Sequence, residues 1–163
     1  WTFLQALASP LKPLGLDYVF AGVWFMGGTL VPYLIRRRGS ALAGEVLAAA
    51  LEGFITQWGI TALIWGLVQG LGSELVFAAP KYKRWDQKTL ILAGGIAGIF
   101  SYILDFFYSQ YWTLQPWIWP IQLICIVAGG AFWAGFVAYR IGKGIQKTGV
   151  TANLLSGEEG SDE

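Results

Sequence analysis

The feature that most constrains this chain is a succession of long apolar stretches separated by short turns or basic clusters. A helix needs about 20 largely apolar residues to cross the hydrocarbon core of a bilayer. Four of the stretches approach this length, and a fifth is shorter and contains two glutamates. The sequence therefore predicts an all-α integral membrane protein with spans at about 18–35, 41–55, 60–79, 89–108 and 117–139.

The composition excludes several classes of function. Charged residues make up 13% of the 163 residues, about half of the share in a typical soluble domain. The chain has no histidine and one cysteine, Cys125, which excludes a Cys/His metal site, a disulfide framework, a bis-histidine haem and a His-based triad. It has no Walker motif, and its basic residues form no patch large enough for nucleic acid. We expect a protein that is not an enzyme, with no cofactor, metal site or nucleic-acid partner.

Three basic clusters assign the two sides of the membrane. Arg36–Arg38, Lys81–Arg84 and Arg140–Lys147 follow the first, third and fifth predicted spans. With alternating spans all three lie on one face, which the positive-inside rule makes cytoplasmic. The opposite loops contain only one basic residue, Lys12. We expect a multi-pass protein of the plasma membrane with its basic loops and C-terminus in the cytoplasm.

The two ends of the chain carry separate predictions. Trp1–Leu7 has the character of the last part of an apolar helix that stops at Ser9-Pro10, because proline cannot continue a helix interior. That helix would reach the outer face, so we expect a further helix upstream and six spans in all, of which this chain holds five and part of another. Residues 149–163 are polar and acidic, which predicts a disordered cytoplasmic tail after a membrane domain of residues 1–148.

Four acidic residues lie within the predicted spans: Glu45, Glu52, Glu74 and Asp105. An ionisable group at membrane depth costs several kcal/mol unless it faces protein, water or a charge of opposite sign. No lysine or arginine lies within a span to neutralise them. Either these acids are protonated and hydrogen-bonded, or a cationic or donor-rich ligand reaches them.

Depth along the helices predicts which acids meet. Glu52 and Asp105 lie within about one turn of the outer ends of their helices. We expect them to converge with polar and aromatic side chains on a cavity that opens to the outside and suits a planar, cationic ligand. The other expected members are Gln69 and Gln122 in the cavity, Trp58, Tyr108 and Tyr111 at its mouth, and Trp24 as a stacking wall. Glu74 lies nearer the cytoplasm, and Glu45 could pair with Arg36–Arg38.

Other functions fit the same acids. Polar side chains within a membrane can join helices to one another without forming a site. A proton- or cation-coupled carrier or channel subunit could use the four acids as a ladder, although such carriers often contain internal repeats and none is evident. A structural anchor subunit of a membrane complex would be favoured if the acids lay between helices with no cavity.

A resemblance to a known family is carried by residues 38–45, Glu52, 66–74, 105–111 and 129–131, and it extends from about Trp24 onward. These segments resemble the YkoE family, the substrate-binding S-components of energy-coupling factor (ECF) transporters linked to thiamine and its hydroxymethylpyrimidine precursor. The resemblance implies a six-helix S-component that captures a vitamin from outside and docks on a transmembrane coupling subunit driven by two cytoplasmic ATPases.

Under this resemblance the ligand is thiamine or a related aminopyrimidine. Glu52 and Asp105 would pair with the thiazolium charge or accept hydrogen bonds from the aminopyrimidine. Trp24 and Tyr111 would stack on the rings, and Gln69 and Glu74 would form the floor of the site.

Overall fold

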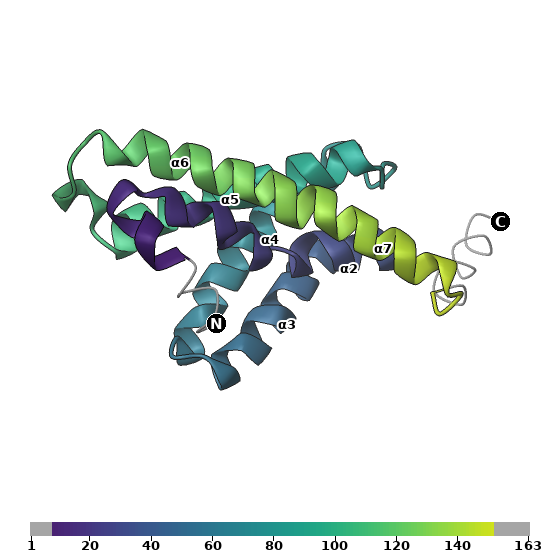
Figure 1. The fold of residues 1–163 in the computed structure, drawn as a ribbon. Coiled ribbons are helices and arrows are strands. Elements are labelled where there is room, and N and C mark those ends of the chain that lie inside the picture. The colour runs from purple at the N-terminus through teal and green to yellow at the C-terminus, as the bar shows by residue number, and fades with distance from the viewer. Residues whose placement is uncertain (1–7, 152–163) are drawn as a thin grey trace.

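The chain is an all-helical bundle in the computed structural model, which describes residues 8–151 (Figure 1). The predicted helix tail at Trp1–Leu7 and most of the predicted acidic tail lie outside the described residues. In chain order the helices are η1 (Ser9–Leu14), η2 (Leu16–Val23), α2 (Gly27–Ile35), α3 (Ser40–Ile55), η3 (Gly59–Thr61), α4 (Ala62–Ala78), α5 (Gln87–Tyr108), η4 (Tyr111–Thr113), α6 (Ile118–Gly129), η5 (Gly130–Val137) and α7 (Ala138–Lys147).

Four helical stretches among the described residues are long and apolar enough to cross a membrane. They are Leu16–Ile35, Gly59–Ala78, Gln87–Tyr108 and Ile118–Lys147. The remaining predicted span, 41–55, is the helix α3 of 16 residues. At 1.5 Å per residue this helix is about 24 Å long, which is shorter than the roughly 30 Å of a bilayer core.

The first predicted span is not a continuous helix. It begins as the 3₁₀ helix η2 and continues as the α-helix α2, with a break at residues 24–26. Trp24 and Phe25 lie in this break. A 3₁₀ helix rises more steeply and winds more tightly than an α-helix, so the change from η2 to α2 alters the direction in which the side chains of this span point.

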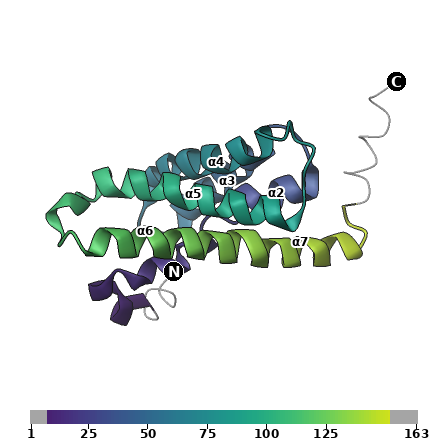
Figure 2. The ribbon, with the colours of Figure 1, turned by 90° about the horizontal axis from the view of Figure 1, so that it is seen from above.

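The last helix is longer than predicted and contains a π-helical segment. The segments α6, η5 and α7 follow one another without a gap and form one helical stretch of 30 residues, which runs alongside α5 (Figures 1 and 2). The two helices touch where Gly94 faces Gly130, since a Cβ on either residue would overlap the carbonyl oxygen of the other. Small residues that let backbones approach in this way are typical of membrane helix pairs.

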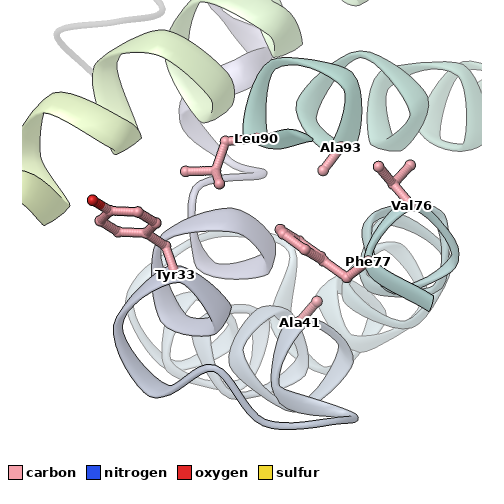
Figure 3. Packing of buried hydrophobic residues seen from close by; sticks show 6 residues of the cluster. All are labelled: Tyr33, Ala41, Val76, Phe77, Leu90 and Ala93. Atoms are coloured by element: carbon pink, nitrogen blue, oxygen red, sulfur yellow. The ribbon is translucent and has the colours of Figure 1, made fainter. Parts of the chain in front are cut away.

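The three basic clusters lie at one end of the bundle. The guanidinium of Arg38 lies 5.7 Å from the ring centre of Tyr82, between Lys81 and Lys83. At the same end the hydroxyl of Tyr33 donates a hydrogen bond to the Gln146 side chain at 3.1 Å. Tyr33 also belongs to the buried core of this end, drawn in Figure 3 with Ala41, Val76, Phe77, Leu90 and Ala93.

A second core lies toward the opposite end, where α3 and α5 end and where α4 and α6 begin. Its buried residues are Phe25, Ala97, Tyr102, Ile126 and Ala134, with Tyr18, Trp24 and Tyr111 packed against them. Phe25 brings the break in the first span into this core. The candidate site lies beside it.

Candidate substrate-binding cavity

A cavity of about 410 Å³ lies among the 3₁₀ helices η1 and η2, the end of α3, the start of α4 and the end of α5. It is therefore at the end of the bundle away from the basic clusters. The lining residues are Ala8, Lys12, Asp17, Tyr18, Phe20, Trp24, Phe25, Ala49, Glu52, Gln57, Trp58, Ala62, Trp65, Gln69, Ser101, Asp105, Tyr108, Ser109 and Tyr111.

Carboxylates dominate the charge of this cavity. Glu52 in the last turn of α3 and Asp105 in the last turn of α5 both line it, together with Asp17 from η2. Lys12 is the one basic side chain among the lining residues. Three acids against one lysine favour a ligand that is cationic or rich in hydrogen-bond donors.

Asp105 is held in place by an aromatic side chain. The indole Nε1 of Trp65 donates a hydrogen bond to Oδ1 of Asp105 at 2.7 Å. The ring of Trp65 in turn packs edge-on against Tyr108, with 4.6 Å between the ring centres. Because one oxygen of Asp105 accepts from the protein, the other remains available to a ligand in the cavity.

Polar side chains at the inner part of the cavity bond to each other. The buried Gln69 donates from Nε2 to Oγ of Ser101 at 2.9 Å, which links α4 to α5. Both residues line the cavity. The Oε1 atom of Gln69, oriented by this bond, is left as an acceptor for a ligand.

Two tyrosines close the side of the cavity formed by η2 and η4. The hydroxyls of Tyr18 and Tyr111 share a hydrogen bond, and their rings meet edge-on. The backbone carbonyl of Tyr111 accepts from Nε1 of Trp119 at 2.7 Å. Burial, and then the charge of Asp17, raise the pKa of Tyr111 to about 12.

Seven of the nine residues predicted for the site line this cavity, which brings together side chains from four separate helical segments and two loops. They are Trp24, Glu52, Trp58, Gln69, Asp105, Tyr108 and Tyr111. Their role in binding a ligand stays a prediction.

Glu74 and Gln122 do not line the cavity. The carboxylate of Glu74 instead accepts hydrogen bonds at the start of α3, from the backbone N–H groups of Gly39 at 2.7 Å and Ala41 at 3.0 Å. It also accepts from the hydroxyl of Tyr82 at 2.8 Å. The structure thus places Glu74, which was expected at the floor of the site, outside the cavity, where it caps the start of α3 at the basic end. Gln122 is buried behind the cavity against Gly15.

Glu45 does not pair with Arg36–Arg38. It is buried, and its Oε2 accepts a hydrogen bond from the backbone N–H of Gly28 at 2.5 Å. An N–H at the start of a helix has no partner within that helix. Glu45 supplies the hydrogen-bond acceptor for the N–H of Gly28 and thereby joins α3 to α2.

Several residues that line the cavity are not among those predicted from the sequence, notably Asp17, Tyr18, Trp65 and Ser101. Trp65 could have been found, because it precedes Gln69 by four residues and therefore shares its helix face. Asp17 and Tyr18 had no such signal, since no residue pattern marks η2 as a 3₁₀ helix turned toward the cavity.

Comparison with known proteins gives the class to which this helical bundle belongs, the membrane components of transporters. The chain belongs to the family described as "ABC-type cobalt transport system, permease component", which matches residues 1–100. It is 32% identical over 158 residues to the putative HMP/thiamine permease protein YkoE of Bacillus subtilis (strain 168), covering 96% of this chain and 79% of that protein.

A solved structure gives the same assignment. It is described as the crystal structure of an S-component of an ECF transporter, and this chain superposes on it with a TM-score of 0.87 at 32% identity. The match covers 97% of this chain and 80% of that one. The resemblance to the YkoE family and the S-component-like helical fold are confirmed, and the chain is a membrane S-component of the ECF type.

Proposed function

We propose that the cavity captures thiamine or a hydroxymethylpyrimidine-type aminopyrimidine from outside the cell, as the substrate-binding step of an ATP-driven ECF importer. The observation that carries the proposal is that Glu52 and Asp105 both line one aromatic-rich cavity of about 410 Å³. Ligand pockets generally have volumes of about 300–1,000 Å³, so this one is large enough for a two-ring vitamin.

The chemistry of the lining matches the two parts of such a ligand. A carboxylate accepts hydrogen bonds from the amino group of an aminopyrimidine, and it attracts the positive charge of a thiazolium. An indole or phenol ring binds a flat cation through its face. Asp105, fixed by Trp65, and Glu52 would supply the acceptors, while Trp24 and Tyr111 would stack on the rings.

The energy for transport would come from partner subunits. The sequence contains no Walker motif, and the solved relative is described as a component of an ECF transporter. A transmembrane coupling subunit and two cytoplasmic ATPase subunits are therefore the partners that we propose.

Titration of the detergent-purified protein with thiamine and with hydroxymethylpyrimidine, followed by tryptophan emission, tests the proposal. We expect saturable quenching by at least one compound, and about tenfold weaker binding or worse in Glu52→Gln and in Asp105→Asn, because each loses a charge-assisted hydrogen bond. Glu74→Gln is the matched control, since it changes an acid outside the cavity and should leave the affinity unaltered. Absence of saturable quenching by both compounds would remove the vitamin hypothesis, and full affinity in both cavity variants would place the site elsewhere.

A further inference from the structure

Glu45 is a buried acid that the proposed binding step does not use directly. Its side chain is 1% exposed, and it lies on α3 one turn before Ala49, which lines the cavity. Its partner is the backbone N–H of Gly28 in the first turn of α2, at 2.5 Å. The bond therefore crosses from a continuous helix to the point at which the broken first span resumes.

The start of α2 is pressed closely against its neighbours. A Cβ on Gly27 would lie 2.9 Å from the carbonyl oxygen of Gly44 and 3.0 Å from Oε2 of Glu45. A Cβ on Gly28 would lie 3.0 Å from Oγ of Ser73 on α4. Two consecutive glycines thus let the carboxylate of Glu45 approach the backbone, and the chain is held between α3 and α4 at this point.

The segment just before this contact forms part of the cavity wall. Trp24 and Phe25 line the cavity and lie three to four residues before Gly28. The turn between them and α2 is short, because the carbonyl of Met26 already accepts from the N–H of Leu30 at 2.8 Å. A displacement of Gly28 would therefore be expected to shift the backbone that carries the two aromatic side chains.

We propose that Glu45 is a positioning residue for substrate capture: by holding the start of α2 it fixes Trp24 and Phe25 in the wall of the cavity. This inference rests on the proposed function, because it assumes that the cavity binds a ligand. Glu45 itself touches no ligand in this scheme. Its effect on affinity passes through the backbone of residues 24–28.

Three substitutions separate this role from general stability. Glu45→Gln keeps an oxygen acceptor for Gly28, Glu45→Asp withdraws the carboxylate by one methylene, and Glu45→Leu removes the acceptor at similar volume. The matched control is Glu74→Leu, which removes the acid that caps α3 at the basic end. Ligand affinity is measured with thiamine and hydroxymethylpyrimidine, and hydrogen exchange is measured over residues 24–29, because emission from nine tryptophans does not report on Trp24 alone.

We expect Glu45→Leu to bind about tenfold more weakly or worse and to exchange faster over residues 24–29. Glu45→Gln should retain both the affinity and the protection of the native chain, and Glu45→Asp should fall between them. Glu74→Leu should lower the thermal midpoint without changing affinity or exchange in this segment. If Glu45→Leu does not fold, Glu45→Asp provides the same comparison.

Two results would overturn the proposal. One is native affinity in a folded Glu45→Leu or Glu45→Asp variant, and the other is unchanged hydrogen exchange over residues 24–29 in the same variants. Failure of the native chain to bind either compound would instead reject the proposed function, and the exchange measurement would still decide whether Glu45 holds this segment.

Discussion

At the scale of single residues, the cavity depends on how each acid is partnered. Glu52 and Asp105 face the cavity, whereas Glu45 and Glu74 accept from backbone N–H groups at the starts of α2 and α3. All four are acids within helices that the sequence predicts to cross the membrane. Their surroundings therefore differ: two of the acids line the cavity and two bond to the protein's own backbone.

The bond between Trp65 and Asp105 offers a test at this scale. In Trp65→Phe the aromatic packing on Tyr108 is retained, but Oδ1 of Asp105 loses its donor at 2.7 Å. A carboxylate without this partner is free to rotate, so it must be ordered again when a ligand binds. We expect about tenfold weaker binding in the emission titration with little change in thermal midpoint.

The control is Trp112→Phe, because Trp112 is exposed and lies outside the cavity. Equal affinities in the Trp65→Phe and Trp112→Phe variants would contradict the role of the bond.

The sequence identifies the acids of the cavity better than it identifies their partners. Depth along the helices was enough to select Glu52 and Asp105 as residues near the same end. Depth also put Glu74 nearer the cytoplasm than these two acids, but it could not identify the partners of Glu74, which come from Gly39–Leu42 at the start of α3, 32 to 35 residues away in sequence. Contacts between helices depend on how the helices rotate about their axes, and a single sequence does not specify that rotation.

At the scale of the elements, the ends of the helices carry the local signals. The helix α5 begins after Asp86, whose side chain accepts from the backbone N–H of Thr89 at 3.1 Å and also from the Thr89 hydroxyl. This is the N-cap arrangement that satisfies an N–H with no partner within the helix. In contrast, nothing in residues 16–35 predicts that the helix breaks at Trp24, and the break is what brings the first span into the cavity.

The N-cap of α5 predicts a pH-dependent stability. The side-chain hydrogen bond from Thr89, then the backbone bond, lower the pKa of Asp86 from its ordinary value of 3.8 in spite of partial burial. A lowered folded-state pKa means that the ionised cap stabilises the fold above pH 3.8, and that this contribution is lost as the pH falls below that value.

Two substitutions at Asp86 isolate this contribution. Asp86→Ala should destabilise the protein by about 1 kcal/mol at neutral pH, as the loss of an N-cap does. Asp86→Asn keeps an oxygen acceptor but does not titrate, so it should match the native chain at pH 7 and lose less stability than the native chain between pH 5 and about pH 3. Thermal unfolding in detergent across this range is the measurement. Parallel pH profiles for the native chain and Asp86→Asn would show that the cap does not depend on its charge.

At the scale of the whole molecule, the cavity and the basic clusters occupy opposite ends of the bundle. The α4–α5 loop and α7 lie at one end, and the α5–α6 connection lies at the other, as Figure 2 shows. This polarity follows from the sequence, because basic residues come after alternate spans. The closeness of Arg38 to Tyr82 shows that two of the clusters meet in space. Because basic loops remain on the cytoplasmic side, we predict that this bundle lies in the membrane with the cavity facing out.

That orientation can be tested with single cysteines, once Cys125, the one native cysteine, is replaced by alanine. Thr113→Cys lies in the loop between α5 and α6, and Lys83→Cys lies in the loop between α4 and α5; both positions are exposed. Because basic loops remain on the cytoplasmic side, a membrane-impermeant maleimide should label Thr113→Cys in intact cells and label Lys83→Cys only after the cells are permeabilised.

The reverse pattern would place the cavity on the cytoplasmic side, where Glu52 and Asp105 could not meet a vitamin arriving from outside. Capture from the exterior would then be untenable even if thiamine bound the purified protein, so the labelling result and the titration test separate parts of the proposed function.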